Sequence, residues 1–282
     1  MITKIDTETA MAAVDRMTDT VCFNGIKTGF NVLDHRMGGF SNGDLIILGG
    51  RPAMGKSTLA LRMIDNVCIN DGKSVLFFSR QMTKEFVAGR LLRLRNGLED
   101  DVKLAGNKAE GKWEAISSDI GNIEKSKLWV DDSVAGDIYG AVEKARKFAK
   151  RNKIDLVIFD LWQLYQVVNL AKNDHDNRLS ELQLLKQLAL DLDCPVLLLS
   201  SIEITAEMRE ASIPDVNDLK YADIIDETAD TILLMYREKY YIPDSDDDSV
   251  MIEIVKNKNC CRHFARISGN ADGSFRLGLT ND

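Results

Sequence analysis

Eight consecutive residues, Gly50 to Ser57, have the types and the spacing needed to hold a phosphate group. They read GRPAMGKS and fit the pattern G-x-x-x-x-G-K-[ST] at every fixed position. In this pattern the glycines let backbone N–H groups turn toward an anion, the lysine reaches the β- and γ-phosphates, and the hydroxyl binds a magnesium ion. The loop therefore predicts a site for ATP and Mg²⁺. The residues expected to contact the nucleotide are Gly50, Arg51, Pro52, Ala53, Met54, Gly55, Lys56, Ser57 and Thr58.

Asp160 is the second residue with a predicted chemical role. It follows four apolar residues in the run LVIFD, which is typical of a buried strand that ends in a carboxylate. The carboxyl ends of parallel strands are where α/β sheets present ligand-binding groups. We therefore expect Asp160 to hold the magnesium ion through water, opposite Ser57.

The loop needs a strand before it and a helix after it, and the sequence supplies both at 44–48 and 58–67. Strands alternating with helices of 10–15 residues imply right-handed crossovers and a mostly parallel sheet with helices on both faces. The sequence therefore predicts an α/β fold. The further strands expected are at 74–79, 128–130, 155–160 and 195–200, and the further helices at 84–96, 113–123, 138–151 and 179–192.

After residue 230 the pattern changes to strands separated by turns, which predicts an antiparallel C-terminal extension of the same sheet. The expected strands are at 231–236, 250–255, 263–268 and 275–279, and the acidic run 244–248 is interpreted as a solvated loop. At the other end, the segment 7–17 has helical spacing. This short helix packs either on its own core or on a neighbouring subunit.

Composition narrows the class of protein. The 282 residues are 45% hydrophobic and 28% charged, which fits a globular protein with one core and small extensions. The formal charge of −8 argues against a protein coated in basic surface for duplex DNA, although a basic lining in a groove would survive this average. No leader and no apolar stretch of membrane-spanning length is visible, so neither secretion nor a membrane partner is indicated.

The five cysteines are scattered and form no C-x-x-C pair, which predicts reduced thiols in a cytoplasmic protein. Cys260, Cys261 and His263 lie close together in the chain. They lack the two-plus-two spacing of a structural zinc site, so metal binding there is the weaker interpretation.

Four segments together resemble the RecA-like motor domain of DnaB-type replicative helicases. They are KTGFNVLDHRMGGFSNGDLIIL, RPAMGKS, LFFSRQM and LVIFDLWQL, and the resemblance runs from about Gly25 to the C-terminus. It implies a RecA-like P-loop NTPase domain over residues 25–282, preceded by a linker-like helix and connector over residues 1–24. It also implies a homo-oligomer, a hexameric ring around single-stranded DNA that hydrolyses ATP between subunits. The family's primase-binding domain has no counterpart in this sequence, which leaves a primase, a loader or another helicase as expected partners.

Carrying the family roles over exposes departures at the catalytic positions. The family has S-x-E-M after its second strand, where the glutamate activates water, but this chain has Gln81 at that position. Glutamine orients a water but accepts no proton, and loss of a general base costs about 10²–10⁴-fold in rate. Glu85, one turn further on, is a speculative substitute.

Two further family positions are also altered. The glutamine that senses the γ-phosphate is replaced by Ser201, and the K-x-R pair that enters the neighbouring site appears as Lys256 and Lys258. Lysine keeps the charge without the planar fork, and an arginine finger is worth about 10³–10⁵-fold. We therefore expect slow hydrolysis.

The predicted DNA-binding run is altered too. The family's D-L-R-E-S-G run lines the pore of the ring, and here the aligned residues read DLKYAD, from Asp218 to Asp223. The aspartate at the glycine position repels phosphate, whereas Lys220 and Tyr221 still offer a charge and a stacking face. Arg209 is the basic residue in the loop before this run. Arg209, Lys220 and Tyr221 are therefore the candidate DNA contacts.

Two hypotheses from different classes follow. In the first, the chain is an ATP-driven motor that translocates along or unwinds DNA in a ring, and the substitutions are neutral drift. In the second, it is a hydrolysis-impaired relative that uses ATP binding as a structural switch to partner or regulate a helicase. A small-molecule kinase is a weaker third alternative, because no acceptor-site motif is evident. DNA-stimulated ATP turnover separates the first two.

Overall fold

The computed structural model describes residues 25–98, 113–167, 173–202, 213–242, 244–245, 247, 249–258 and 263–267. Their centre is an eight-stranded sheet with the order β3-β2-β4-β5-β1-β6-β7-β8. The strands are β1 (Leu45–Gly50), β2 (Val75–Ser79), β3 (Leu128–Asp131), β4 (Leu156–Asp160), β5 (Val196–Ser201), β6 (Thr231–Tyr236), β7 (Val250–Asn257) and β8 (His263–Ile267).

Strands β1 to β6 run parallel to one another, and β7 and β8 complete the sheet in antiparallel pairing. The expected antiparallel extension is therefore confirmed for β7 and β8. The prediction was wrong for β6, which pairs parallel with β1, Gly50 lying opposite Met235. The chain between β5 and β6 includes α8 (Ala222–Thr228) and is long enough to cross over to a parallel neighbour, so turn-rich texture alone did not define the pairing.

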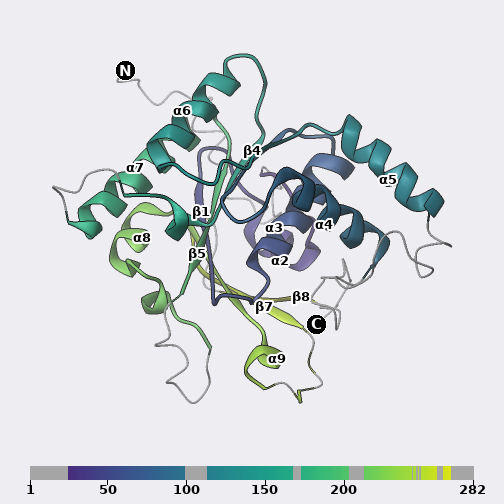
Figure 1. The fold of residues 1–282 in the computed structure, drawn as a ribbon. Coiled ribbons are helices and arrows are strands. Elements are labelled where there is room, and N and C mark those ends of the chain that lie inside the picture. Colours follow the sequence, from purple (N-terminus) through teal and green to yellow (C-terminus); the bar gives the residue numbers. More distant parts are fainter. Residues whose placement is uncertain are drawn as a thin grey trace, which may run out of the picture.

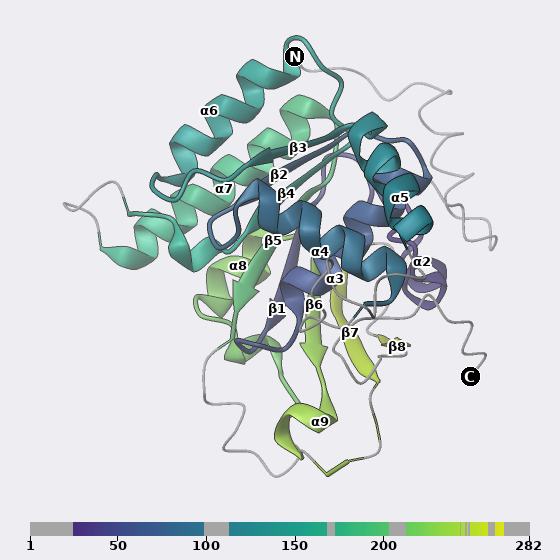
Figure 2. The ribbon, with the colours of Figure 1, turned by 45° about the vertical axis from the view of Figure 1, so that its right-hand side comes forward.

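Helices cover both faces of the sheet (Figures 1 and 2). Alternate residues of β1 point to opposite faces, so Leu45 and Ile47 enter one core while Ile46 and Leu48 enter the other. The first core is shared with α6 (Ile138–Ala149), α7 (Asp174–Leu192) and α8, and the second with α2 (Asn31–Met37), α3 (Lys56–Ile64) and α4 (Lys84–Asn96). Helix α5 (Trp113–Lys125) contacts α4 on its outer side.

The helices expected from the sequence form within a few residues of the predicted bounds, apart from an earlier start for α7. Two local features were not predicted. The helix after the loop continues as a π-helical segment, Asp65–Asn70, and a short helix α9 (Glu238–Tyr241) follows β6. The predicted segments 7–17 and 275–279 lie outside the described residues, as do Cys260 and Cys261.

Among the residues that the structure describes, no helix combines the length and the apolar character that a membrane span needs. Within the same residues, no three His, Cys, Asp or Glu side chains are grouped to hold a metal ion.

Candidate nucleotide site

The loop between β1 and α3 is shaped by residues in the left-handed backbone region. Gly55, which caps α3, has φ of 100°, and Ala53 has φ of 61°. Glycine adopts this conformation without steric cost, which accounts for its place at the start of the helix. The first N–H groups of α3 have no acceptor within the helix, and together with the helix dipole they favour an anion there.

Lys56 is buried within the loop that it follows. Its Nζ donates to the carbonyl oxygens of Gly50 at 2.6 Å and Arg51 at 2.9 Å. Burial lowers the pKa of Lys56 to about 8, a shift that the charge of Asp160 opposes and the charge of Arg51 reinforces. The ammonium group thus stands in a desolvated position at the edge of the loop.

Asp160 ends β4 and is completely buried. Neither oxygen of its carboxylate has a hydrogen-bond partner of good geometry. Burial raises its pKa, and the nearby Ser57 hydroxyl together with the charges of Lys56 and Arg90 opposes this rise. Because a buried carboxylate without a partner is costly, the pair of Asp160 and Ser57 fits a magnesium ion, which favours hard oxygen ligands.

Arg90 adds a positive group that the sequence reasoning missed. It lies on α4, and its Nη2 donates to the hydroxyl of Thr58 at 3.1 Å. It also acts electrostatically on Asp160. Since α4 packs against α3 only in the folded chain, no spacing in the sequence points to this contact.

Gln81 lies just beyond the end of β2, beside the end of β4. Ser79 is opposite Asp160 in the parallel register, and the N–H of Arg80 donates to the carbonyl of Asp160 at 2.7 Å. The Arg80 guanidinium lies 4.4 Å from the centre of the Tyr165 ring and donates to the carbonyl of Ser133. The Gln81 side chain is exposed at this edge of the sheet.

Ser201 ends β5 and is held by Gln163, the glutamine of the segment LVIFDLWQL. Gln163 Oε1 accepts from the N–H of Ser201 at 3.1 Å, and its Nε2 donates to the hydroxyl of Ser200 at 2.8 Å. One side chain therefore ties the end of β4 to the end of β5. The sequence analysis used this glutamine only as part of a motif, because its partner strand depends on the order of the sheet.

Lys256 and Lys258 lie at the end of the parallel strands opposite to the loop. We call the end of the strands that carries the loop the loop edge of the sheet, and the opposite end the far edge. In the register of β6 and β7, Met235 pairs with Ile252 near the loop, whereas Thr231 pairs with Asn257 at the far end. Lys258 forms an ion pair with the buried carboxylate of Asp44, and Lys256 donates to the carbonyl of Asp226. These two lysines are thus separated from Gly50–Ser57 of their own chain by the length of the strands.

Lys220 and Tyr221 follow a short 3₁₀ turn on the route from β5 to β6. Lys220 is exposed, and its Nζ lies 4.9 Å from the centre of the Tyr221 ring. Tyr221 has φ of 67°, and its hydroxyl contacts the carboxylate of Asp174. Arg209 lies outside the described residues. Two of the three candidate DNA contacts are therefore adjacent and linked by a cation–ring contact.

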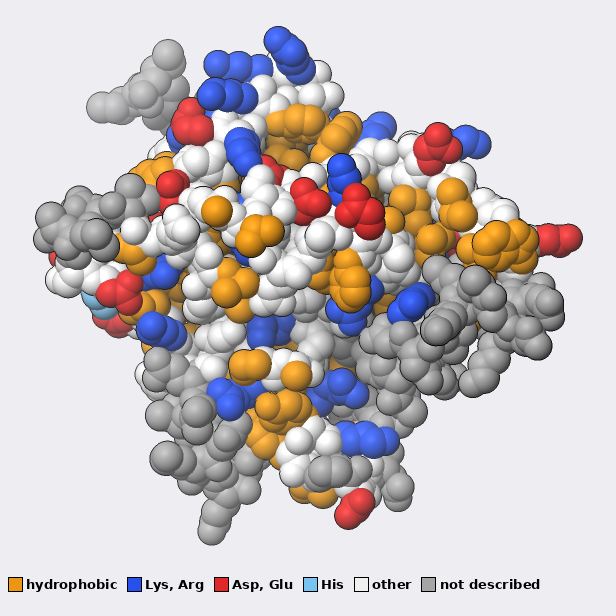
Figure 3. All heavy atoms as spheres, viewed as in Figure 1, with side chains coloured by type: hydrophobic (Ala, Val, Ile, Leu, Met, Phe, Trp, Pro, Cys, Tyr) orange, Lys and Arg blue, Asp and Glu red, His pale blue; other side chains and the backbone are white. Residues whose placement is uncertain are grey.

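Lys and Arg side chains also gather over α6 (Figure 3, top of the view). Several are already paired: Lys144 lies 2.6 Å from Asp131, and Arg146 lies 2.8 Å from Asp191. These pairs reduce the positive field of the helix, in line with a chain of net negative charge.

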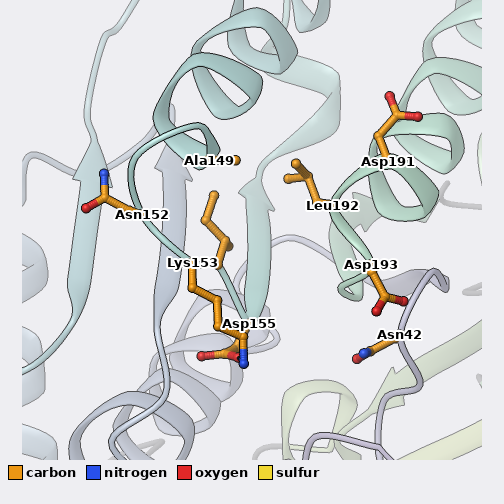
Figure 4. Close-up of a pocket in the computed structure, with 9 residues that line it drawn as sticks. Asn42, Ala149, Asn152, Lys153, Asp155, Asp191, Leu192 and Asp193 are labelled. Atoms are coloured by element: carbon orange, nitrogen blue, oxygen red, sulfur yellow. Dashed lines mark ion pairs between the residues drawn. The ribbon is translucent and has the colours of Figure 1, made fainter.

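A polar pocket of about 400 Å³ lies at the far edge of the sheet, between the ends of α6 and α7 (Figure 4). Asp155 lines it, and burial of this carboxylate is outweighed by hydrogen bonds from Ser74 and an ion pair with Lys153, which lower its pKa. Asp191 lines it too and is paired with Arg146. The contrast with Asp160 indicates that the pocket is held by structural contacts, whereas the carboxylate at the loop edge accepts no hydrogen bond of good geometry.

The sheet order and the loop define the class of this protein as an α/β protein of RecA-like fold that carries a P-loop sequence motif. Its sheet and helices superimpose on a solved structure titled as an ATPase domain with a TM-score of 0.88, 23% identity, and coverage of 98% of this chain and 99% of that one. The RadB recombinase also matches, with a TM-score of 0.56 at 17% identity, over 88% of this chain and 97% of the RadB chain.

The family follows from the sequence comparisons. The model of the DnaB-like helicase C terminal domain matches residues 25–268. The replicative DNA helicase DnaB of Rickettsia prowazekii is 33% identical over 77% of this chain and 47% of the relative, and the Bacillus subtilis replicative DNA helicase DnaC is 29% identical over 83% and 52%. This chain therefore belongs to the family of DnaB-like helicase C-terminal domains. It spans about half the length of these curated relatives.

Proposed function

We propose that the chain is the nucleotide-driven motor domain of a DnaB-like replicative helicase, binding ATP with magnesium at Gly50–Ser57 and acting on single-stranded DNA as a ring. The observation that carries the proposal is the buried carboxylate of Asp160, whose two oxygens have no hydrogen-bond partner of good geometry. A fold does not retain such a group for stability, because an unpaired buried polar group costs about 1–3 kcal/mol.

The polar groups of the loop and the carboxylate of Asp160 have defined roles in this proposal. On nucleotide binding, Lys56 exchanges the carbonyls of Gly50 and Arg51 for phosphate oxygens, which are stronger acceptors. The N–H groups at the start of α3 bind the phosphates, while Ser57 and Asp160 hold the metal. A magnesium ion held by these two residues would supply positive charge that offsets the negative charge of the phosphate oxygens.

Hydrolysis depends on residues from two subunits. Gln81, at the end of β2 beside Asp160, orients the attacking water without accepting its proton. Lys256 and Lys258 lie at the far edge of the sheet, so they serve the site of a neighbouring subunit rather than their own. Residues 1–24 are proposed as the connector that links the motor domain to a neighbouring subunit of the ring. Arg90, and Ser201 as the γ-phosphate sensor, complete the site within one chain.

Lys220 and Tyr221 are proposed as DNA contacts that use one charge and one stacking surface. A relative's structure is titled "The Structure Of A DnaB-Like Replicative Helicase And Its Interactions With Primase", and it covers 98% of this chain with a TM-score of 0.86. By this likeness we propose a primase as the partner of the assembled ring, and from the family resemblance we propose a loader or another helicase as alternatives. The two relatives compared by sequence above are replicative helicases, so the comparisons do not favour the alternative of a hydrolysis-impaired switch.

The test is ATP turnover with and without single-stranded DNA, combined with a mass measurement in the presence of an ATP analogue and an oligonucleotide. We expect ring-sized particles that carry both ligands, together with slow turnover that DNA stimulates. Lys56→Ala serves as the control, because it should weaken analogue binding and abolish the turnover. Nucleotide binding without any DNA binding or turnover, in the wild type and in Gln81→Glu, would contradict the motor function and support the switch.

A further inference from the structure

Trp162 lies two residues after Asp160 and is completely buried. Its indole Nε1 donates to Oε2 of Glu181 at 2.7 Å. Arg178 donates to the same oxygen at 2.8 Å, and its guanidinium lies 5.6 Å from the centre of the Trp162 ring. Because Glu181 is buried as well, the indole is fixed by a hydrogen bond on its edge and a cation on its face.

The indole also contacts Tyr221, the residue after Lys220. The two rings meet edge to face, with centres 5.8 Å apart and an angle of 63° between their planes. The Tyr221 hydroxyl contacts Asp174 at the start of α7, which also carries Arg178 and Glu181. Trp162 is therefore the side chain that stands between the end of β4 and the Lys220–Tyr221 pair.

The backbone on both sides of this contact is also constrained. Leu219 forms a bridge with Ile202, just after the end of β5. A Cβ atom added to Gly49 would come within 2.7 Å of Cδ2 of Leu219, so the strand that leads into the phosphate loop lies directly against this segment. Gln163 ties β4 to β5. A displacement of these strand ends would therefore act on residues 219–221 through close-packed atoms.

We propose that Trp162 is a positioning residue that couples nucleotide binding at Asp160 to DNA binding by Lys220 and Tyr221. This inference rests on the proposed function and extends it to the regulation of the same site. When Asp160 binds a metal ion, a displacement of the backbone at the end of β4 moves the Trp162 indole. The indole moves the Tyr221 ring, and this changes the position of Lys220. Trp162 touches neither ligand and acts through Tyr221.

Coupling of this kind is measured as the factor by which one ligand changes the affinity for the other. The factor must be the same whether nucleotide changes the DNA affinity or DNA changes the nucleotide affinity. The affinity for a non-hydrolysable ATP analogue with magnesium is measured with and without oligo-dT. The affinity for oligo-dT is then measured with and without the analogue. We expect the wild type to give a factor of about 5–150 in each direction, the usual range for coupled sites.

Three variants isolate the contact. Trp162→Leu removes the ring contact and the indole donor, and we expect the factor to fall to about 1, with the affinity for the analogue alone changed less than about twofold. Trp162→Phe keeps a ring against Tyr221 and should retain most of the coupling. The matched control is Trp129→Leu, because Trp129 makes a similar edge-to-face contact with Phe148, at 4.9 Å and 63°, on the outermost parallel strand β3. It should leave the factor unchanged.

If Trp162→Leu does not fold, Tyr221→Leu removes the same ring contact at a half-buried residue. We expect it to abolish the coupling too. An unchanged factor in the variant that folds would overturn the inference while leaving the proposed function intact, as would a wild-type factor of 1 with both ligands bound. Failure of the wild type to bind the analogue or oligo-dT would overturn both.

Discussion

The aspartates at the two edges of the sheet differ in whether their carboxylates have partners. At the far edge, Asp44 is paired with Lys258, and Asp155 accepts from the backbone N–H and the hydroxyl of Ser74. At the loop edge, Asp160 is buried more completely and has neither an ion pair nor a well-formed hydrogen bond. Both edges carry aspartates beside parallel strands, so the difference separates carboxylates that hold the fold together from Asp160, which we propose holds a metal ion.

The largest expected effect concerns catalysis at the loop edge. Replacing Gln81 by glutamate supplies a general base beside Asp160, and such a group contributes about 10²–10⁴-fold to rate. We expect Gln81→Glu to raise DNA-stimulated ATP turnover by up to that factor, as measured by phosphate release. Gln81→Ala is the matched control and should give no rise. Equal turnover in the glutamate variant and the wild type would mean that Ser201 or the lysines from the neighbouring subunit limit the reaction instead.

The second effect concerns nucleotide affinity. Lys56→Ala removes the ammonium group that faces the phosphates, and charge-assisted hydrogen bonds of about 1.5–3 kcal/mol predict a loss of about 10–100-fold in affinity for an ATP analogue. Equilibrium binding of a fluorescent analogue measures it. Lys153→Ala, at the far edge, should bind as the wild type does. A comparable loss in both variants would contradict the assignment of the site.

The third effect is on the free energy of unfolding, which should differ between variants of Asp155 and variants of Asp160. Asp155→Ala leaves the N–H of Ser74 without its acceptor and should lower the free energy of unfolding by about 1–3 kcal/mol, without changing nucleotide affinity. Asp160→Asn removes a buried charge that has no partner, so it should be neutral or stabilising in the absence of nucleotide. Urea unfolding of both variants compares them. A greater loss for Asp160→Asn would show that this carboxylate supports the fold.

The smallest effect is in the pH dependence of binding. In the nucleotide-free protein, Lys56 has a pKa of about 8, whereas phosphate stabilises its charged form. Binding between about pH 8 and 9 should therefore take up a fraction of a proton, and affinity should fall as the pH rises through this range. Calorimetry in buffers of different ionisation enthalpy measures the uptake, which should be absent in Lys56→Ala.

The same pKa has a consequence for stability with a definite sign. In the unfolded chain the ordinary value of 10.5 applies, so between about pH 8 and 10.5 the unfolded state binds more protons than the folded state. The free energy of unfolding of the wild type should therefore rise with pH in this window relative to that of Lys56→Ala.

The sequence was most informative where function depends on residues close together in the chain. The loop Gly50–Ser57 and the strand ending in Asp160 could be predicted because each has a fixed local pattern. The contacts of Arg90 with Thr58 and of Gln163 with Ser200 could not, because they depend on which helix or strand becomes the neighbour after folding.

The direction in which strands pair could be predicted only in part from the sequence. The side of the sheet on which Lys256 and Lys258 lie follows from the antiparallel register of β7, and the parallel pairing of β6 was predicted wrongly. Neither is encoded in periodicity, because a strand reads the same in both directions. The aromatic contact between Trp162 and Tyr221 joins residues far apart in the chain and was likewise invisible to pattern reasoning.

The most direct test of the central claim is the magnesium dependence of nucleotide affinity in the wild type, Asp160→Asn and Asp155→Asn. Titration of an ATP analogue with and without Mg²⁺ should show tighter binding with the metal in the wild type and in Asp155→Asn, and no such gain in Asp160→Asn. A full magnesium effect in Asp160→Asn, or its loss in Asp155→Asn, would contradict the account of the two edges.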